Sequence, residues 1–181
     1  MDTFEYHLDK CFEIAAEKYN CEDPFDKCKY REIIAAEKLG HNLFEGASGG
    51  KYNDETYGAD ATDPKDNDGK VEYKSAKMTK TQYDKYKNGV LKKKYTMVYN
   101  GAYDKESIAR YANIRHMLNL FYKAELVATV EVPTGYVLET LNENLDYDNA
   151  RRANGEIVTT NCNSVGVQFE DNTPTIGEVI D

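Results

Sequence analysis

The sequence predicts an α/β protein in which helices flank a mixed central β-sheet. Helical stripes of apolar residues fill the first 40 positions, and strand-like runs alternate with helical patterns after residue 57. The chain has 181 residues, which is enough for a single domain with a buried core, and it contains no linker long enough to divide it. We therefore expect one domain over residues 1–181.

The first two elements are expected to be helices. Residues 2–19 carry apolar side chains at helical spacing, and Asp23-Pro24 interrupts the pattern. A second helix is expected over 27–39, with Asp26 as its N-cap and Gly40 as its C-terminal glycine. This part of the chain therefore begins with a helical pair.

A β-hairpin is expected next. The turn sequence PKDNDG separates two short runs with strand character. The expected elements of this region are a loop over 41–57, strands over 57–61 and 70–76, a helix over 79–88 that ends at Asn88-Gly89, and a strand over 95–100.

Residues 104–122 show the clearest helical pattern in the chain. Apolar side chains recur there at helical spacing from Ile108 to Phe121, so we expect a long amphipathic helix. Strands are expected over 125–132 and 156–169. The acidic residues 171–181 are expected to form a loosely held tail.

Composition favours a soluble cytoplasmic protein. No apolar run is long enough to span a bilayer, and the first residues, MDTFEYHLDK, are acidic rather than signal-like. We expect no membrane association. The four cysteines and three histidines show no spacing typical of a zinc site.

Charge is segregated along the chain. The net charge is −9, yet residues 70–94 hold nine lysines against two acidic residues, a local balance of +7, so the remainder carries −16. A local positive field attracts phosphates whatever the net charge of the protein. The segment therefore favours a nucleic-acid partner, and a solvated lysine-rich surface is the alternative.

The stretch GADATDPKDNDGKVEYKS, residues 58–75, carries the candidate chemistry. Side chains alternate along a strand, so Glu72 and Lys74 share one face, which we expect to be open, while Val71 and Tyr73 point to the core. The hairpin is expected to bring Asp60 close to Glu72. Two carboxylates suit Mg²⁺, which completes its shell with water and phosphate oxygens, and a neighbouring lysine can position a water.

Three other interpretations of residues 58–75 follow from the same sequence. Asp63 is a rival to Asp60 as the first metal ligand. An EF-hand calcium loop is excluded, because aligning Gly69 with its invariant glycine puts Pro64 and Ser75 where carboxylates are needed. A polar hairpin with structural salt bridges remains the alternative to a catalytic site.

The Asp60, Glu72 and Lys74 pattern resembles the PD-(D/E)XK nuclease signature, with Ala59 in place of the usual proline. The resemblance implies a restriction-endonuclease-like core, here about residues 26–135, and a Mg²⁺-dependent deoxyribonuclease most like a small type II restriction enzyme. It implies one or two Mg²⁺ ions held by Asp60 and Glu72, with Lys74 positioning the attacking water. Because the family often adds a helix glutamate, it also implies Glu32 as a further catalytic and metal-binding residue.

Double-stranded DNA is the expected partner, and a palindromic site would favour a homodimer. Polar and basic side chains near the motif are expected to contact DNA: Lys77, Lys80, Gln82, Lys92, Lys93, Lys94, Ser48, Lys51 and Asn53. The alternatives to a restriction enzyme are a structure-specific or non-specific nuclease and a catalytically inert nucleic-acid-binding module.

Overall fold

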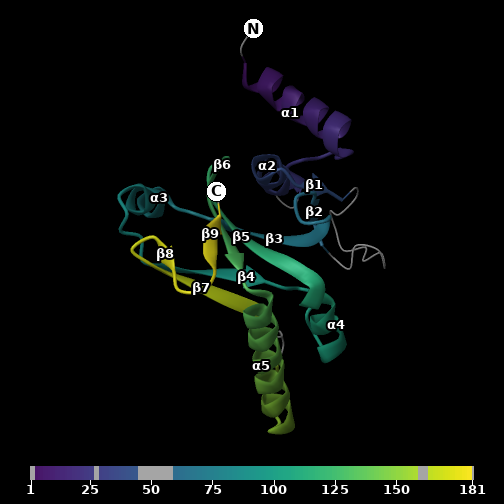
Figure 1. Cartoon of the computed structure of the whole chain (residues 1–181), viewed down its shortest axis with the longest axis vertical. Helices are drawn as coiled ribbons and strands as arrows, with labels where there is room; N and C mark the ends of the chain where they lie inside the picture. Colours follow the sequence, from purple (N-terminus) through teal and green to yellow (C-terminus); the bar gives the residue numbers. More distant parts are fainter. Residues whose placement is uncertain (1–2, 27–28, 45–58, 159–162, 181) are drawn as a thin grey trace. The chain divides into compact units, whose positions relative to one another are not determined.

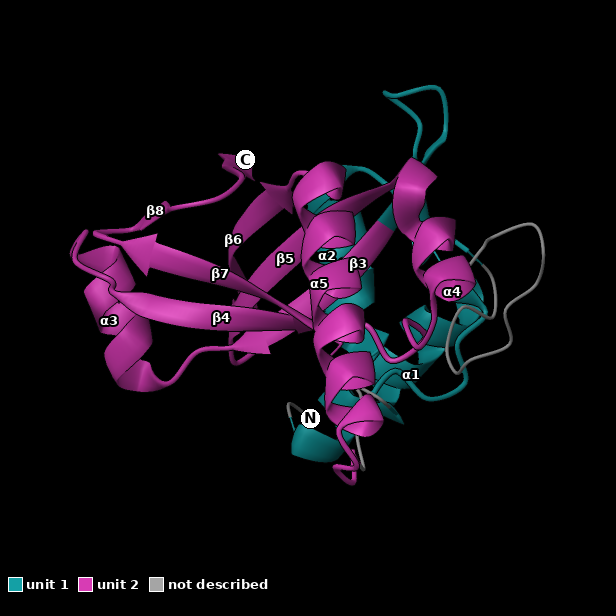
Figure 2. Ribbon diagram, turned by 90° about the horizontal axis from the view of Figure 1, so that it is seen from below, with its two compact units in different colours: residues 1–71 teal, residues 72–181 magenta. Residues whose placement is uncertain are grey.

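The computed structural model describes residues 3–26, 29–44, 59–158 and 163–180 (Figure 1). It confirms an α/β protein with a central β-sheet. The chain divides into two compact units, residues 1–71 and 72–181, coloured separately in Figure 2. Each unit is described by itself. Among the described helices, none combines the length and apolar character that crossing a bilayer requires.

Unit 1 begins with the two expected helices. Helix α1 spans Phe4–Tyr19 and helix α2 spans Lys29–Leu39. Gly40 follows α2 with a φ of +74°, the left-handed conformation expected of a C-terminal glycine. The small core of this unit forms where Ala15 of α1 meets Cys21 and Ile33. Both helices are therefore confirmed within the described residues.

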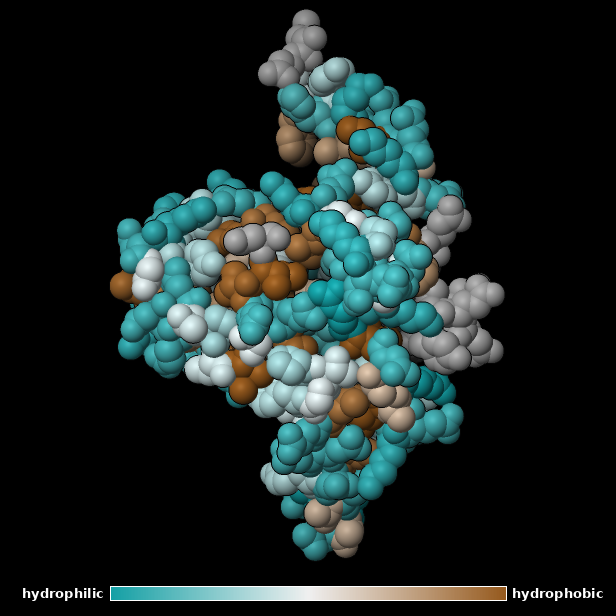
Figure 3. Space-filling model, viewed as in Figure 1, coloured by the Kyte–Doolittle hydropathy of each residue, from teal (hydrophilic) through white to brown (hydrophobic). Residues whose placement is uncertain are grey.

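The surface of α1 is mostly hydrophilic, with apolar side chains between the polar ones (Figure 3). Of the apolar side chains expected to form its stripe, only Ala15 is buried, and Phe4 is 83% exposed. Packing of α1 in unit 1 is therefore concentrated at its C-terminal end.

Unit 1 also contains the expected hairpin. Strand β1, Asn42–Leu43, pairs with β2, Ala61–Asp63, which pairs in turn with the start of β3, Gly69–Lys77. The turn between β2 and β3 places Asn67 and Asp68 at positive φ, a conformation that these residue types tolerate. Strand β2 begins one residue after Asp60, so the expectation that a strand leads into Asp60 is wrong at Ala59 and Asp60.

Unit 2 contains two sheets. In the first, the rest of β3 is followed by β5 (Ile114–Tyr122), β6 (Glu125–Val132) and β9 (Glu178–Ile180). In the second, β4 (Lys93–Val98) pairs with β7 (Ser164–Glu170), which pairs with β8 (Thr173–Pro174). Figure 2 shows β4 and β7 side by side. The expected helix over 79–88 is α3, Lys80–Lys87, with Thr79 as its N-cap.

The expected long helix over 104–122 is wrong after residue 113. Helix α4 covers only Lys105–Ala109, a 3₁₀ turn (η2) covers Arg110–Asn113, and the rest is strand β5. In β5 only Arg115 and Tyr122 are partly exposed, so both faces of the strand are covered. A strand buried on both faces has a continuous apolar run, which cannot be told from a helix by spacing alone.

Helix α5, Thr134–Ala153, lies in a stretch for which the sequence analysis assigned no element. Its buried positions are Val137, Leu141, Leu145 and Asp148, about one residue per turn. So narrow a stripe gives a weak periodic signal. The helix contacts α4, η2, β5 and β7, and therefore covers part of unit 2.

The expected loose tail is also wrong for the described residues up to 180. Strand β9 pairs with β6, with Val179 opposite Val130. Gly177 permits this approach, because its φ is +86° and a Cβ there would lie 2.3 Å from the Glu131 carbonyl oxygen. The acidic segment is therefore held as part of the sheet.

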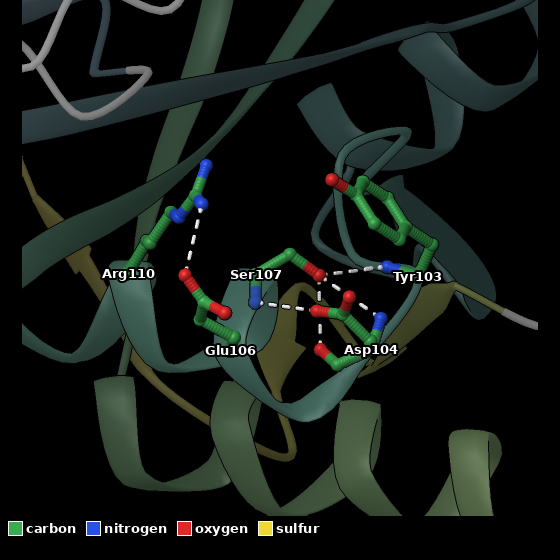
Figure 4. Close-up of polar contacts among 5 residues, drawn as sticks. All are labelled: Tyr103, Asp104, Glu106, Ser107 and Arg110. Carbon is green, nitrogen blue, oxygen red and sulfur yellow. Dashed lines mark hydrogen bonds and ion pairs between the residues drawn. The ribbon is translucent and has the colours of Figure 1, made fainter.

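A side-chain cap starts α4 (Figure 4). The Ser107 backbone N–H donates to Asp104 Oδ1 at 2.7 Å, and the Asp104 N–H donates to Ser107 Oγ at 3.0 Å. The Ser107 hydroxyl donates to the Asp104 carbonyl at 2.9 Å. The bond from the Ser107 backbone N–H to Oδ1, followed by the effect of the nearby Ser107 side chain, lowers the pKa of the Asp104 carboxyl below its ordinary value.

We expect the contribution of Asp104 to stability to depend on pH. The folded-state pKa is lower than the unfolded one, so the ionised carboxylate stabilises the fold above the unfolded pKa, and this is lost as pH falls through the folded pKa. Asp104→Ala should lower the urea midpoint at pH 7 and have a smaller effect in acid. Asp104→Asn, which still caps, should remove the pH-dependent part alone. Equal effects of Asp104→Ala at pH 7 and in acid would contradict the lowered pKa of Asp104.

Candidate active site

The hairpin of unit 1 fixes the backbone of Asp60. Its N–H donates to the Val71 carbonyl at 2.9 Å, and its own carbonyl accepts from the Phe44 N–H at 3.0 Å. The strand register places Ala61 opposite Val71, the residue immediately before Glu72. Asp60 is half-buried. This candidate ligand therefore lies on well-ordered backbone next to the start of β2.

Asp63, the rival ligand, has a structural role in the turn. Its Oδ1 accepts the backbone N–H of Lys65 at 2.9 Å, and its Oδ2 lies 3.5 Å from His41 Nε2. The residue is 6% exposed. One oxygen therefore holds the turn and the other lies near His41, which follows α2, and Asp63 stays the alternative to Asp60 as the first ligand.

Glu32 lies in the first turn of α2, where its carboxylate forms an ion pair with Lys29. Lys29 is buried, whereas the Glu32 side chain is 23% exposed. The other glutamate of this helix, Glu37, accepts a hydrogen bond from the Tyr19 hydroxyl at 2.5 Å. Burial, together with that bond, raises the pKa of Tyr19 to about 12. Both helix glutamates are thus engaged within unit 1.

Glu72 and Lys74 belong to unit 2 and meet on β3. They share one face of the strand, and Glu72 Oε1 forms an ion pair with Lys74 Nζ. Glu72 is only 4% exposed, so the expectation that it lies on an open face is wrong. Val71 and Tyr73 are buried as expected, and β3 is therefore covered on both faces over these residues. Lys74 keeps 21% of its side chain exposed.

The buried ion pair is not explained by stability. Removing a carboxylate and an ammonium from water costs several kcal/mol per ion, and their attraction recovers about that amount only in good geometry. Apolar residues of similar volume often stabilise such positions as well or better. Sites that break the rule of apolar cores tend to be functional.

A buried aromatic group adjoins Lys74. Its Nζ lies 5.0 Å from the ring centroid of Tyr99, and the Tyr99 hydroxyl lies 3.0 Å from His116 Nδ1. His116 is fully buried on β5, which corrects its expected place on an amphipathic helix. Sequence reasoning did not single out Tyr99. It was expected on a strand over 95–100, but β4 ends at Val98, and its partner could be found only by recognising 114–122 as a strand.

The expected DNA-contacting residues of β3 and α3 divide into two kinds. Lys77 is exposed at the end of β3, and Lys80 is exposed but forms an ion pair with Asp84. Gln82 belongs to the capping box of α3, where its side chain accepts from the Thr79 N–H at 2.9 Å. Gln82 therefore has a structural role, and the two lysines remain candidate phosphate contacts.

The three-lysine cluster lies at the start of β4. Lys93 and Lys94 are exposed on the strand, and Lys94 passes over Gly166 of β7. Lys92 Nζ lies 3.5 Å from Glu170 Oε2 and 3.7 Å from Asp171 Oδ1. These carboxylates neutralise part of the charge of Lys92. The expected contacts Ser48, Lys51 and Asn53 lie outside the described residues.

Over the described ranges, no three histidine, cysteine or acidic side chains gather as a metal-binding group. Comparison with known proteins adds no assignment, since neither the protein-family models nor the curated proteins match this sequence. The candidate site therefore rests on the residues themselves.

Proposed function

We propose that this protein is a Mg²⁺-dependent endodeoxyribonuclease of PD-(D/E)XK type with a restriction-endonuclease-like core, most like a small type II restriction enzyme. The observation that carries the proposal is the buried Glu72 carboxylate paired with Lys74 two residues later on β3. The motif resemblance adds Asp60, whose backbone the adjoining hairpin holds firmly.

The donor set fits Mg²⁺. Asp60 and Glu72 supply carboxylate oxygens, the hard ligands that this ion takes, and one or two carboxylates suffice because water and phosphate complete the shell. Glu72 lies within the regular strand β3 and pairs with Lys74, which suits an ion that demands regular geometry. We include Glu32 as the support for the ion or for a second one, which requires it to exchange its Lys29 partner.

The reaction we propose is attack of water on a phosphodiester, which leaves a 5′-phosphate and a 3′-hydroxyl. Bound Mg²⁺ supplies Lewis-acid activation of the phosphate. Glu72 and Asp60 supply the negative charge that holds the ion. The Lys74 ammonium, fixed by Glu72, orients the attacking water and offsets the negative charge that develops on the phosphate.

The positively charged segment 70–94 supports DNA as the substrate. Lys77, Lys93 and Lys94 are exposed within it, and each can neutralise a phosphate. Double-stranded DNA is the proposed partner. A homodimer is proposed with it, since a two-fold protein would match a palindromic site.

Incubation with unmethylated DNA of phage length in Mg²⁺ tests the proposal. A sequence-specific enzyme gives discrete fragments, whereas a non-specific nuclease gives a smear and a structure-specific one cuts branched substrates only. An inert binding module retards the DNA without cutting it under any divalent metal. Discrete fragments are the expected result.

We expect Ca²⁺ to support DNA binding without turnover when it replaces Mg²⁺. Ca²⁺ accepts the same oxygens, but its longer bonds and irregular shell activate phosphate and water less well. Gel retardation and cleavage, measured on one duplex in each metal, check this expectation. Cleavage in Ca²⁺ at a rate similar to that in Mg²⁺ would count against the proposed metal site.

A further inference from the structure

The Lys74 ammonium contacts the face of the Tyr99 ring. The distance from Nζ to the ring centroid is 5.0 Å, within the range of a cation–π contact. Tyr99 is fully buried, whereas Lys74 retains some exposure. The amine is therefore held by two groups of unit 2, the Glu72 carboxylate and the Tyr99 ring.

Hydrogen bonds fix the Tyr99 ring. His116 Nε2 lies 3.3 Å from the Tyr111 carbonyl oxygen, which can only accept, so Nε2 carries the proton. In neutral His116 the other nitrogen, Nδ1, is then an acceptor, and the Tyr99 hydroxyl donates to it at 3.0 Å. These contacts fix which atom donates and which accepts: His116 Nε2 and the Tyr99 hydroxyl donate, and His116 Nδ1 accepts. The phenol therefore cannot rotate away without breaking a buried hydrogen bond.

Ring packing adds a second constraint. The Tyr111 ring meets Tyr99 edge-on at 5.1 Å between centroids with an interplanar angle of 78°. The His116 ring does so at 5.5 Å and 71°. Edge-to-face arrangements of this kind are favourable for aromatic pairs. The face of Tyr99 is thus set by neighbours from η2 and β5.

Neither ring group changes charge near neutral pH. Burial is the main cause that lowers the pKa of His116, to about 4, and the nearby Lys74 charge acts in the same direction. Burial, followed by the Glu72 charge, raises the pKa of Tyr99. The hydrogen bond between them therefore persists over the range in which a nuclease would work.

We propose that Tyr99 is a positioning residue that holds Lys74 in place for the reaction, and that His116 fixes the Tyr99 ring through its hydroxyl. The inference rests on the proposed function, because the role of Lys74 in the reaction is what makes its position matter. A buried, hydrogen-bonded phenol and imidazole contribute little net stability over apolar residues. They do orient the ring on which the amine rests.

The first test is spectroscopic and needs no DNA. In protein labelled at the lysine ε-carbons, the Lys74 resonance is assigned by its loss in Lys74→Arg. Its ε-protons should lie upfield of those of exposed Lys77 and Lys85, because they lie over an aromatic face. Tyr99→Leu should remove that shift and Tyr99→Phe should keep it.

Tyr95→Leu is the matched control for this test. Tyr95 is 5% exposed on β4 and packs edge-on against Phe169 of the neighbouring strand β7, so the change removes a buried phenol in the sheet that does not contain Lys74. It should leave the Lys74 shift unchanged. Absence of an upfield shift in the wild-type protein would overturn the inference even where Tyr99→Leu does not fold.

The second test is kinetic. Tyr99→Leu should lower kcat on the order of tenfold, with KM within about twofold, since a misplaced amine affects the reacting phosphate more than DNA binding. Tyr99→Phe should recover most of the lost rate. Equal losses in both variants would overturn the role of the ring. An upfield Lys74 shift in a protein that cuts no DNA would leave the Tyr99 contact standing and reject the proposed function.

Discussion

Lys74→Ala is expected to lower the rate of Mg²⁺-dependent DNA cleavage on the order of 10³-fold, and Glu72→Gln by at least as much. The first change removes the charge that stabilises the transition state, and the second weakens the hold on the metal. Single-turnover cleavage of a short duplex measures both. Ser75→Ala, at the exposed position that follows Lys74 on β3, should cleave at the wild-type rate.

The two single variants also break an ion pair in which Glu72 is buried, so loss of activity could reflect loss of the fold. Removing one partner of such a pair costs about 3–5 kcal/mol, whereas replacing both is often neutral. Glu72→Leu combined with Lys74→Met, which replaces both charged groups with apolar side chains, should therefore regain stability toward urea and stay inactive. A double variant that regains both stability and cleavage would show that the pair is structural only.

Leu120→Ala is expected to have the largest effect on stability, a loss of about 2–5 kcal/mol of unfolding free energy. Leu120 is fully buried on β5, opposite Ala128 of β6. The control is Ile157→Ala at an 87% exposed position, which should change stability by less than about 0.5 kcal/mol. Urea unfolding measures both.

The effect of Leu120→Ala also tests whether residues 114–122 form a strand or a helix. On the helix that local spacing predicts for 104–122, Leu120 lies off the apolar stripe formed by residues such as Leu118 and Phe121. On strand β5 all three are buried. A small effect of Leu120→Ala, similar to that of Ile157→Ala, would contradict the strand.

Local sequence signals predicted the elements whose ends are marked by glycine or by turn residues. Gly40 ends α2 at positive φ, Asn88-Gly89 follows α3, and the turn from Pro64 to Asp68 joins β2 and β3. Each depends on backbone preferences of a few adjacent residues. These elements could therefore be located without tertiary information.

Contacts between residues distant in sequence determine the structure of the elements that were not predicted. Met117 and Leu118 favour a helix by propensity, but pairing with β6 and burial on both faces make them strand residues. Gly177 allows β9 to reach β6, some 50 residues away in sequence. Neither interaction leaves a local pattern.

The sequence likewise predicted only part of the candidate site. Alternation along β3 correctly placed Glu72 and Lys74 on one face, where they form an ion pair. The burial of Glu72 and the group formed by Tyr99 and His116 depend on strands distant in sequence. The candidate catalytic residues could thus be proposed from sequence, and their surroundings could not.

We propose that this chain hydrolyses DNA phosphodiesters with Mg²⁺. The most direct measurement is strand scission of a labelled duplex, equilibrated with the protein without metal and started by adding Mg²⁺. We predict scission that gives 5′-phosphate and 3′-hydroxyl ends, which DNA ligase can rejoin, and no scission with Lys74→Ala. Intact DNA with the wild-type protein in both Mg²⁺ and Mn²⁺ would contradict the account.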